Sequence, residues 1–226
     1  MAVMDEFKEE REKIKNAPFE TKLQYFKDYY LMKTIIILLV LLVGGSYLFT
    51  VLTKKEEAVY VTLVNFSETQ ESHNGLIEPF IKKYLNPRKQ TVNLDSSSYI
   101  SADENEANII KYGYEDEQRL FAMVMTGDID LFISGEDVMG RYALQQWFDD
   151  LRTVLSEEAF KQLEKEDRLL YWDGVPIGVR LEEPSLLFDY YYYNGRQGET
   201  IYAGFTTGSR HRETTVQFLN YLITGE

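Results

Sequence analysis

Residues Thr34–Thr53 read TIIILLVLLVGGSYLFTVLT, 20 consecutive positions without Asp, Glu, Lys, Arg or His. At the rise of an α-helix this length covers about 30 Å, the thickness of the hydrocarbon core of a bilayer. A core helix of a soluble domain is usually shorter and keeps a polar face. The segment 34–53 therefore predicts one transmembrane helix in contact with membrane lipid.

The lysines that flank this run predict its orientation. Cytoplasmic flanks carry the excess of Lys and Arg, counted within about 20 residues of the span. Four lysines precede the run and two follow it: Lys15, Lys22, Lys27 and Lys33 before, Lys54 and Lys55 after. We expect a single-pass protein of the cell membrane with a cytoplasmic N-terminus and an extracytoplasmic C-terminal domain.

A cleaved signal peptide is the alternative interpretation of the same run. Signal peptides have an apolar region of about 7–15 residues, followed by small residues at the cleavage site. Here 33 residues come before a 20-residue run, and its exit contains Tyr47, Leu48 and Phe49. These features favour an uncleaved anchor.

Residues 1–33 are expected to form a cytoplasmic tail that ends in an amphipathic juxtamembrane helix. Four apolar side chains recur at spacings of 4, 3 and 4, which is one helical face: Phe19, Leu23, Phe26 and Tyr30. Lys22 and Lys27 lie off that face. We expect this helix at the inner headgroup boundary, with a docking surface for a cytoplasmic partner as the alternative.

Residues 56–226 are numerous enough for one domain with its own core. They hold 15 of the 24 basic and 30 of the 37 acidic residues, a net charge of −15. Nucleic-acid binding requires clustered Lys and Arg, so this charge argues against it. The chain has no cysteine, and its two histidines, His73 and His211, are isolated. Neither a metal site nor a cofactor is expected.

From residue 58 to residue 165, strand-like and helix-like segments alternate. Apolar β-branched runs predict strands, and apolar residues spaced by three and four predict helices. The predicted strands are 58–66, 90–94 and 129–133, and the predicted helices are 75–85, 115–125, 138–147 and 156–165. Such an order is typical of the α/β class, in which helices cover a parallel sheet.

After Leu169 the pattern changes. Strand-like runs cover 175–181, 186–193 and 200–205, and Asn194-Gly195 between the last two is a turn dipeptide. We therefore expect a β-hairpin across this turn. The segment 210–223 has apolar residues at helical spacing and predicts a closing helix.

Three segments resemble extracellular solute-binding proteins of ABC importers, of the type 2 periplasmic-binding-protein kind. They are GDIDLFISGEDVMGRYALQQWFDDL (Gly127–Leu151), DGVPIGVRL (Asp173–Leu181) and IYAGFTTGSRHRETTVQFLNYLIT (Ile201–Thr224). The family has two lobes that close on a ligand. This chain has only 19 residues between Leu181 and Ile201, where the family places most of its second lobe. The resemblance therefore implies a one-lobe α/β sandwich with a β-hairpin and a closing helix, preceded by one transmembrane helix.

The juxtamembrane stretch carries a second resemblance. KLQYFKDYYLMK (Lys22–Lys33), placed before a single span, is similar to a group of single-span membrane proteins of Gram-positive bacteria. Binding proteins of such bacteria usually hang from a lipidated cysteine, and this chain has none.

Ligands of an open parallel sheet bind at the carboxyl ends of its strands. This rule predicts ligand-binding residues at Ser67, Glu68 and Thr69 after the first strand and at Ser134, Gly135 and Glu136 after the third. Backbone N–H groups at the start of the next helix suit an anionic group, and in the resembled family this turn contacts the ligand. The structural alternative is that Ser134 caps the helix, a contribution of about 1 kcal/mol.

Tyr190, Tyr191, Tyr192 and Tyr193 form an unbroken aromatic run. In a strand, alternate side chains face opposite sides, so two of them are expected to be exposed as an interaction surface for carbohydrate or protein. The alternative is a strand that uses residues of high β-propensity on both faces.

No motif identifies a catalytic residue, and the chain is expected not to be an enzyme. We expect non-enzymatic recognition of a small solute or an envelope protein at the cell surface, for example as a transporter accessory. The alternative is a structural or assembly subunit of a cell-envelope complex that binds no small ligand.

Overall fold

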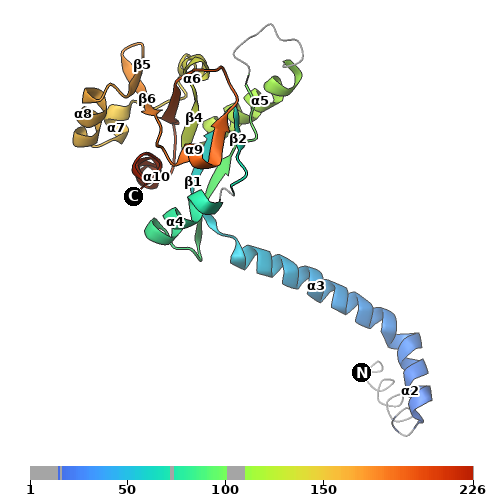
Figure 1. Ribbon diagram of the computed structural model, residues 1–226. Coiled ribbons are helices and arrows are strands. Elements are labelled where there is room, and N and C mark those ends of the chain that lie inside the picture. The colour runs from blue at the N-terminus through green and yellow to red at the C-terminus, as the bar shows by residue number, and fades with distance from the viewer. Residues whose placement is uncertain (1–14, 16, 72–73, 101–109, 226) are drawn as a thin grey trace. The chain divides into compact units, whose positions relative to one another are not determined.

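The computed structural model describes residue 15 and residues 17–71, 74–100 and 110–225 (Figure 1). The chain divides into two compact units, Met1–Lys54 and Lys55–Glu226, and each is described by itself. Most of the expected cytoplasmic tail, and His73 of the second unit, lie outside the described residues.

From Phe19 to Thr53 the first unit is a continuous helical run of α2 (Phe19–Tyr25), the π-helix η1 (Phe26–Tyr30) and α3 (Leu31–Thr53). Within α3, Leu31–Val51 has a mean hydropathy of 2.4, and none of its most apolar window is buried. Among the described residues it is the one helix long and apolar enough to cross a membrane. An apolar helix was predicted at this place, and it begins three residues before the predicted start.

In the second unit, six of the described strands form one mixed sheet in the order β3-β1-β4-β8-β6-β5. The strands are β1 (Glu56–Leu63), β3 (Gln90–Asp95), β4 (Leu131–Gly135), β5 (Leu169–Trp172), β6 (Val175–Leu181) and β8 (Ile201–Phe205). β1 pairs in parallel with β3 and β4, and the other three pairs are antiparallel. The predicted parallel β-α-β part is therefore confirmed. A separate ribbon pairs β2 (Phe66–Glu68) with β7 (Tyr191–Tyr193).

Helices cover both faces of the large sheet (Figure 1). They are α4 (Asn74–Tyr84), α5 (Ile110–Thr126), α6 (Glu136–Ala143), α7 (Leu151–Val154), α8 (Glu157–Lys165), α9 (Leu187–Tyr190) and α10 (Arg212–Thr224). Successive side chains of a strand point to opposite faces of the sheet. Leu131 and Ile133 of β4 face the core with α4 and α10, and Phe132 faces the core with α5 and α6.

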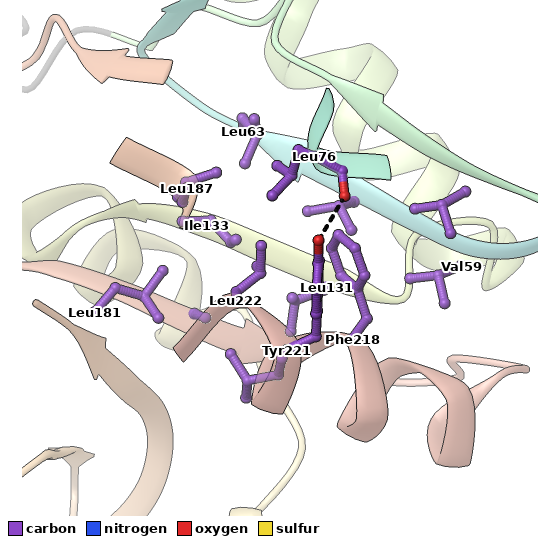
Figure 2. Packing of buried hydrophobic residues seen from close by; sticks show 14 of the residues in the cluster. Val59, Leu63, Leu76, Leu131, Ile133, Leu181, Leu187, Phe218, Tyr221 and Leu222 are labelled. Carbon is purple, nitrogen blue, oxygen red and sulfur yellow. Dashed lines mark hydrogen bonds between the residues drawn. The ribbon is translucent and has the colours of Figure 1, made fainter. Parts of the chain in front are cut away.

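The closing helix α10 confirms the prediction made from its apolar spacing, and Figure 2 shows how it packs. Phe218 lies edge-on to Phe80 of α4, with ring centroids 4.9 Å apart. The buried phenol of Tyr221 donates a hydrogen bond of 3.1 Å to the backbone carbonyl of Leu76. Two helices separated by more than 100 residues are thus joined by ring packing and one polar contact.

The predicted strand over 186–193 is wrong in its first half. Ser185 donates its hydroxyl to the carbonyl of Leu222 at 2.8 Å, and the N–H of Leu186 donates to the same carbonyl. These bonds to α10 turn the chain into the short helix α9, whose Leu187 is fully buried. Burial of Leu187 and the bonds to Leu222 outweigh the β-propensity of the aromatic residues that follow.

The expected hairpin across Asn194-Gly195 is also wrong. β7 pairs with β2, while β8 pairs with β4 and β6. The hairpin of the large sheet is instead β5–β6, joined by Asp173-Gly174 with φ of 48° and 76°. Positive φ at both turn positions is the type I′ geometry that Asp-Gly adopts readily.

Candidate functional site

The residues predicted to bind a ligand lie where β1 and β4 end. Ser134 and Gly135 close β4, and Glu136 opens α6. Ser67 and Glu68 belong to β2, and Thr69 follows it. Their hydrogen bonds run inward: Ser134 Oγ to the Val64 carbonyl at 3.3 Å, Thr69 N to the Tyr190 carbonyl at 2.8 Å, and Asn194 Nδ2 to Ser67 Oγ at 2.6 Å. The first bond joins the end of β4 to the residue after β1, and the other two join the β2 segment to the β7 segment.

Ser134 does not cap α6, so the structural alternative given for this residue is wrong. It is fully buried inside β4, the N-cap of α6 is Gly135, and no side chain of that residue is available to cap. The capping acceptor comes from Glu199, whose Oε1 accepts the N–H of Asp137 at 2.7 Å. A carboxylate at this end also suits the helix dipole.

Tyr193 holds the other oxygen of the same carboxylate. Its phenol donates to Glu199 Oε2 at 2.7 Å, and its ring packs on Phe66 with centroids 5.2 Å apart. Burial, followed by the bond to Glu199, raises the pKa of Tyr193 well above that of a free phenol. The phenol therefore keeps its proton and remains a donor at neutral pH.

The Tyr193–Glu199 pair fills the position predicted for a ligand. A Cβ placed on Gly135 would lie 2.2 Å from Glu199 Cδ and 2.2 Å from Tyr193 Oη. Because 2.2 Å lies far inside van der Waals contact, a side chain at position 135 would displace the Glu199 carboxylate and the Tyr193 hydroxyl. At the start of α6, a carboxylate of the chain itself stands where an anionic ligand would be expected.

The four tyrosines predicted as an interaction surface occupy different environments. Tyr191 is fully buried, Tyr190 and Tyr193 are half-buried, and Tyr192 is 51% exposed. Tyr190 closes over Gly75, where an added Cβ would meet its ring at 2.8 Å. The structure thus leaves one tyrosine of the run, Tyr192, facing solvent where two were expected.

A second polar cluster, centred on Asp130, was not predicted. Asp130 is 1% exposed. Its Oδ2 accepts the N–H of Tyr60 at 2.9 Å, and its Oδ1 accepts the hydroxyl of Ser209 at 2.8 Å. His211 places Nδ1 3.1 Å from Oδ2 and donates its backbone N–H to Oδ1 at 3.3 Å. The carboxylate therefore joins β1, the start of β4 and the approach to α10.

The Asp130 cluster borders a hollow of about 560 Å³. Tyr60, Asp128, Arg210 and His211 are among its lining residues. A buried Asp that orients an imidazole can serve proton transfer, provided a nucleophile or substrate atom lies within hydrogen-bond reach. The hollow is lined by no serine or threonine among the described residues, and those residues contain no group of three His, Cys, Asp or Glu that could hold a metal ion.

A second hollow, of about 470 Å³, lies between α5 and the segment after α6. Phe121, Tyr142 and Trp147 supply its aromatic wall, and Glu117, Gln118 and Gln145 its polar rim. Tyr142 stacks on Trp147 with ring centroids 4.0 Å apart and an angle of 9° between the planes. Both rings are buried, so they pack the core beneath the hollow and offer no open stacking face.

In comparisons with known proteins, no family model matches this chain, and neither a curated protein nor a solved structure matches it.

Proposed function

We propose that this chain is a membrane-anchored, non-enzymatic recognition domain whose partner is another protein of the cell envelope. In this proposal α3 spans the cell membrane, the N-terminus is cytoplasmic, and residues 56–226 form an extracytoplasmic domain related to one lobe of a solute-binding protein. The observation that carries the choice of partner is the filled edge of the sheet, where Tyr193 and Glu199 meet Asp137.

A small solute is the less favoured ligand because of what it would have to displace. The carboxyl ends of β1 and β4 are the usual ligand position of such a sheet. Here Glu199 accepts two hydrogen bonds at that position, and the space above Gly135 is taken. An entering solute would have to replace both bonds before gaining any of its own.

A protein partner is supported by the exposed side chain of Tyr192. It lies in the middle of β7, opposite Ser67 in the β2–β7 ribbon. Tyrosine is enriched at protein interfaces because a large apolar ring carries a polar tip. The same filled edge also favours the alternative of a permanent assembly subunit of an envelope complex, which differs only in the lifetime of the contact.

Thermal unfolding of the full chain in detergent tests the exclusion of small ligands. A ligand that binds the native state raises the unfolding temperature by mass action. With saccharides, amino acids and short peptides, we expect no rise for the wild type. A concentration-dependent rise with any of them would show that the domain binds a solute and would contradict the proposed protein partner. Running Glu199→Ala beside the wild type shows whether an opened edge gains a ligand.

Co-purification from membranes tests the protein partner. Losing a tyrosine that is a hot spot of an interface costs about 2 kcal/mol or more, roughly a thirtyfold loss of affinity. Tyr192→Asp should therefore deplete a co-purifying envelope protein, while Glu158→Lys, a control at another exposed position on α8, should not. Equal recovery with both variants would contradict the assignment of this surface.

Fractionation tests the anchor itself. An arginine at the centre of a span costs about 3 kcal/mol of insertion free energy, so Leu41→Arg should reduce recovery in the membrane fraction. Protease added to intact cells should remove residues 56–226. A wild-type chain that stays soluble after lysis without detergent would contradict the anchor.

A further inference from the structure

The π-helix η1 gathers aromatic rings at the head of the apolar helix. The N–H of Leu31 donates to the carbonyl of Phe26, five residues back. In an α-helix, residues five apart are about 140° apart around the axis. The wider π turn brings Tyr25 and Tyr30 together, with ring centroids 5.8 Å apart, and Phe26 stacks on Tyr30 at 6.3 Å. Aromatic rings of this kind collect at the membrane–water interface.

The same segment has an apolar face that no described residue covers. Phe19 is 77% exposed and Leu23 45% exposed, and Phe26 and Tyr30 continue the face. Lys22 lies on one side of this face and Lys27 on the other, as their positions around the helix require. Lysines in this arrangement can lay their stems along an apolar surface and place their charges in the headgroup layer.

The net positive charge of the segment favours contact with anionic lipid over contact with neutral lipid. Between residues 15 and 33 there are four lysines and two acids, Glu20 and Asp28. Lys33 also places Nζ 5.8 Å from the centroid of the Tyr30 ring. Basic residues next to a span are attracted to anionic lipid headgroups.

We propose that Phe19–Tyr30 lies in the headgroup layer and binds anionic phospholipid. The apolar face contacts the acyl boundary, and Lys22 and Lys27 contact lipid phosphates. Lipid is the chosen occupant because the segment continues without a break into α3, none of whose apolar window is buried. The inference rests on the proposed membrane anchor.

Because the chain has no cysteine, single nitroxide labels can test this directly. The full chain is reconstituted in vesicles of phosphatidylcholine alone or with phosphatidylglycerol added. Labels are placed at Leu23→Cys on the apolar face, at Thr21→Cys on the opposite face as a matched control, and at Leu41→Cys within α3. Electron paramagnetic resonance then compares accessibility to oxygen, which enters lipid, with accessibility to a water-soluble nickel complex.

We expect the oxygen-to-nickel ratio to be high at positions 41 and 23 and low at position 21. In vesicles with phosphatidylglycerol, Lys22→Ser with Lys27→Ser should lower the ratio at position 23. The matched pair Lys54→Ser with Lys55→Ser should leave it unchanged, and neither pair should act in phosphatidylcholine alone.

Other outcomes separate the inference from the anchor. A low ratio at position 23 with a high ratio at position 41 overturns the inference and leaves the anchor in place. Low ratios at both positions overturn both. Spin–spin broadening at position 23 would show that a second copy covers the face. An oxygen-to-nickel ratio at position 23 that does not change when Lys22 and Lys27 are replaced would show that anionic lipid is not recognised. Either result overturns the proposal.

Discussion

Glu199 caps helix α6 by accepting the backbone N–H of Asp137, which lies 62 residues earlier in the chain, at 2.7 Å. An N-cap acceptor usually comes from a residue adjacent to the helix. Here the loop between β7 and β8 supplies it, so the order of that loop and the order of the first turn of α6 depend on each other. Tyr193 adds a third member by donating to the same carboxylate.

Replacement of Glu199 by alanine should destabilise the domain by about 1–2 kcal/mol, because one cap and one acceptor of a half-buried phenol are lost together. Denaturant unfolding of the full chain can measure this. Trp147 and Trp172 are its two tryptophans, so intrinsic tryptophan fluorescence reports on residues 56–226 alone. The control is Gln197→Ala, an exposed neighbour in the same loop. Equal stability of the two variants would contradict the capping role.

Asp130→Ala should be far more damaging than Asp128→Ala. The first removes a buried carboxylate that serves Tyr60, Ser209 and His211, and leaves their donors without an acceptor, at a cost of about 3 kcal/mol or more. The second removes an exposed carboxylate that pairs with Arg210 at 3.5 Å and accepts the Thr126 hydroxyl at 2.5 Å, surface contacts that together contribute about 1 kcal/mol. Similar unfolding midpoints for these two variants would exclude the structural role of Asp130.

Asp95 should make the domain sensitive to acid. Burial alone would raise its pKa, but hydrogen bonds from Ser97 and the guanidinium of Arg119, 2.9 Å away, outweigh burial and hold the pKa below its ordinary value. A carboxylate with a lowered folded-state pKa stabilises the fold above its unfolded pKa of about 3.9, and this stabilisation is lost as the pH falls through the folded pKa.

The stability gap between the wild type and Asp95→Asn should therefore be largest at neutral pH and should narrow as the pH falls below about 4. The free energy of unfolding at several pH values gives this gap directly. Glu158→Gln, which removes an exposed charge on α8, serves as the comparison. A gap for Asp95→Asn that stays constant from neutral to acid pH would contradict the role of this carboxylate.

Two substitutions in α10 should differ in size. Phe218→Ala empties a fully buried position against Phe80 and should cost about 3–5 kcal/mol. Tyr221→Phe keeps the ring, loses only the hydrogen bond to the carbonyl of Leu76, and should cost about 1 kcal/mol. If Tyr221→Phe were as destabilising as Phe218→Ala, the polar contact rather than the ring packing would dominate this helix interface.

The sequence allowed correct prediction of elements whose signal is local. The 34–53 run, the β1-α4-β3 order and the spacing of α10 each follow from apolar periodicity within one segment. The helix predicted over 156–165 is likewise confirmed, as α8, and the hydroxyl of Ser156 at its N-cap accepts the N–H of Ala159. Periodicity and caps act within a few residues, so one sequence is enough to find them.

The failures concern contacts between distant segments. Ser134 has the spacing of a cap, but β4 extends through it and buries it, and Glu199 takes its role. The run 186–193 has strand-forming residues, but its first half is bent by bonds to Leu222. Local propensity is weaker than tertiary contacts of this kind. The residues next to 134 and 186 in the sequence do not indicate the distant residues that these segments contact.

Two missed features did have a local signal. Asp173-Gly174 is a strong hairpin dipeptide, and it marks the β5–β6 turn. Asp130 interrupts the apolar run Ile129–Ile133. A lone acid in a strand that is otherwise buried must be exposed or fully hydrogen-bonded, which points to a partner such as His211.

In sequence, only Lys54 and Lys55 separate α3 from β1, and β1 is an interior strand paired on both sides in parallel. Tension that reaches the domain along its N-terminal tether therefore enters through an inner strand rather than a peripheral one. Pulling β1 out lengthwise requires its bonds to β3 and β4 to shear together instead of opening one after another. Mechanical rupture is limited by the unfolding rate, so this arrangement predicts slow unfolding when the domain is pulled from its N-terminal end.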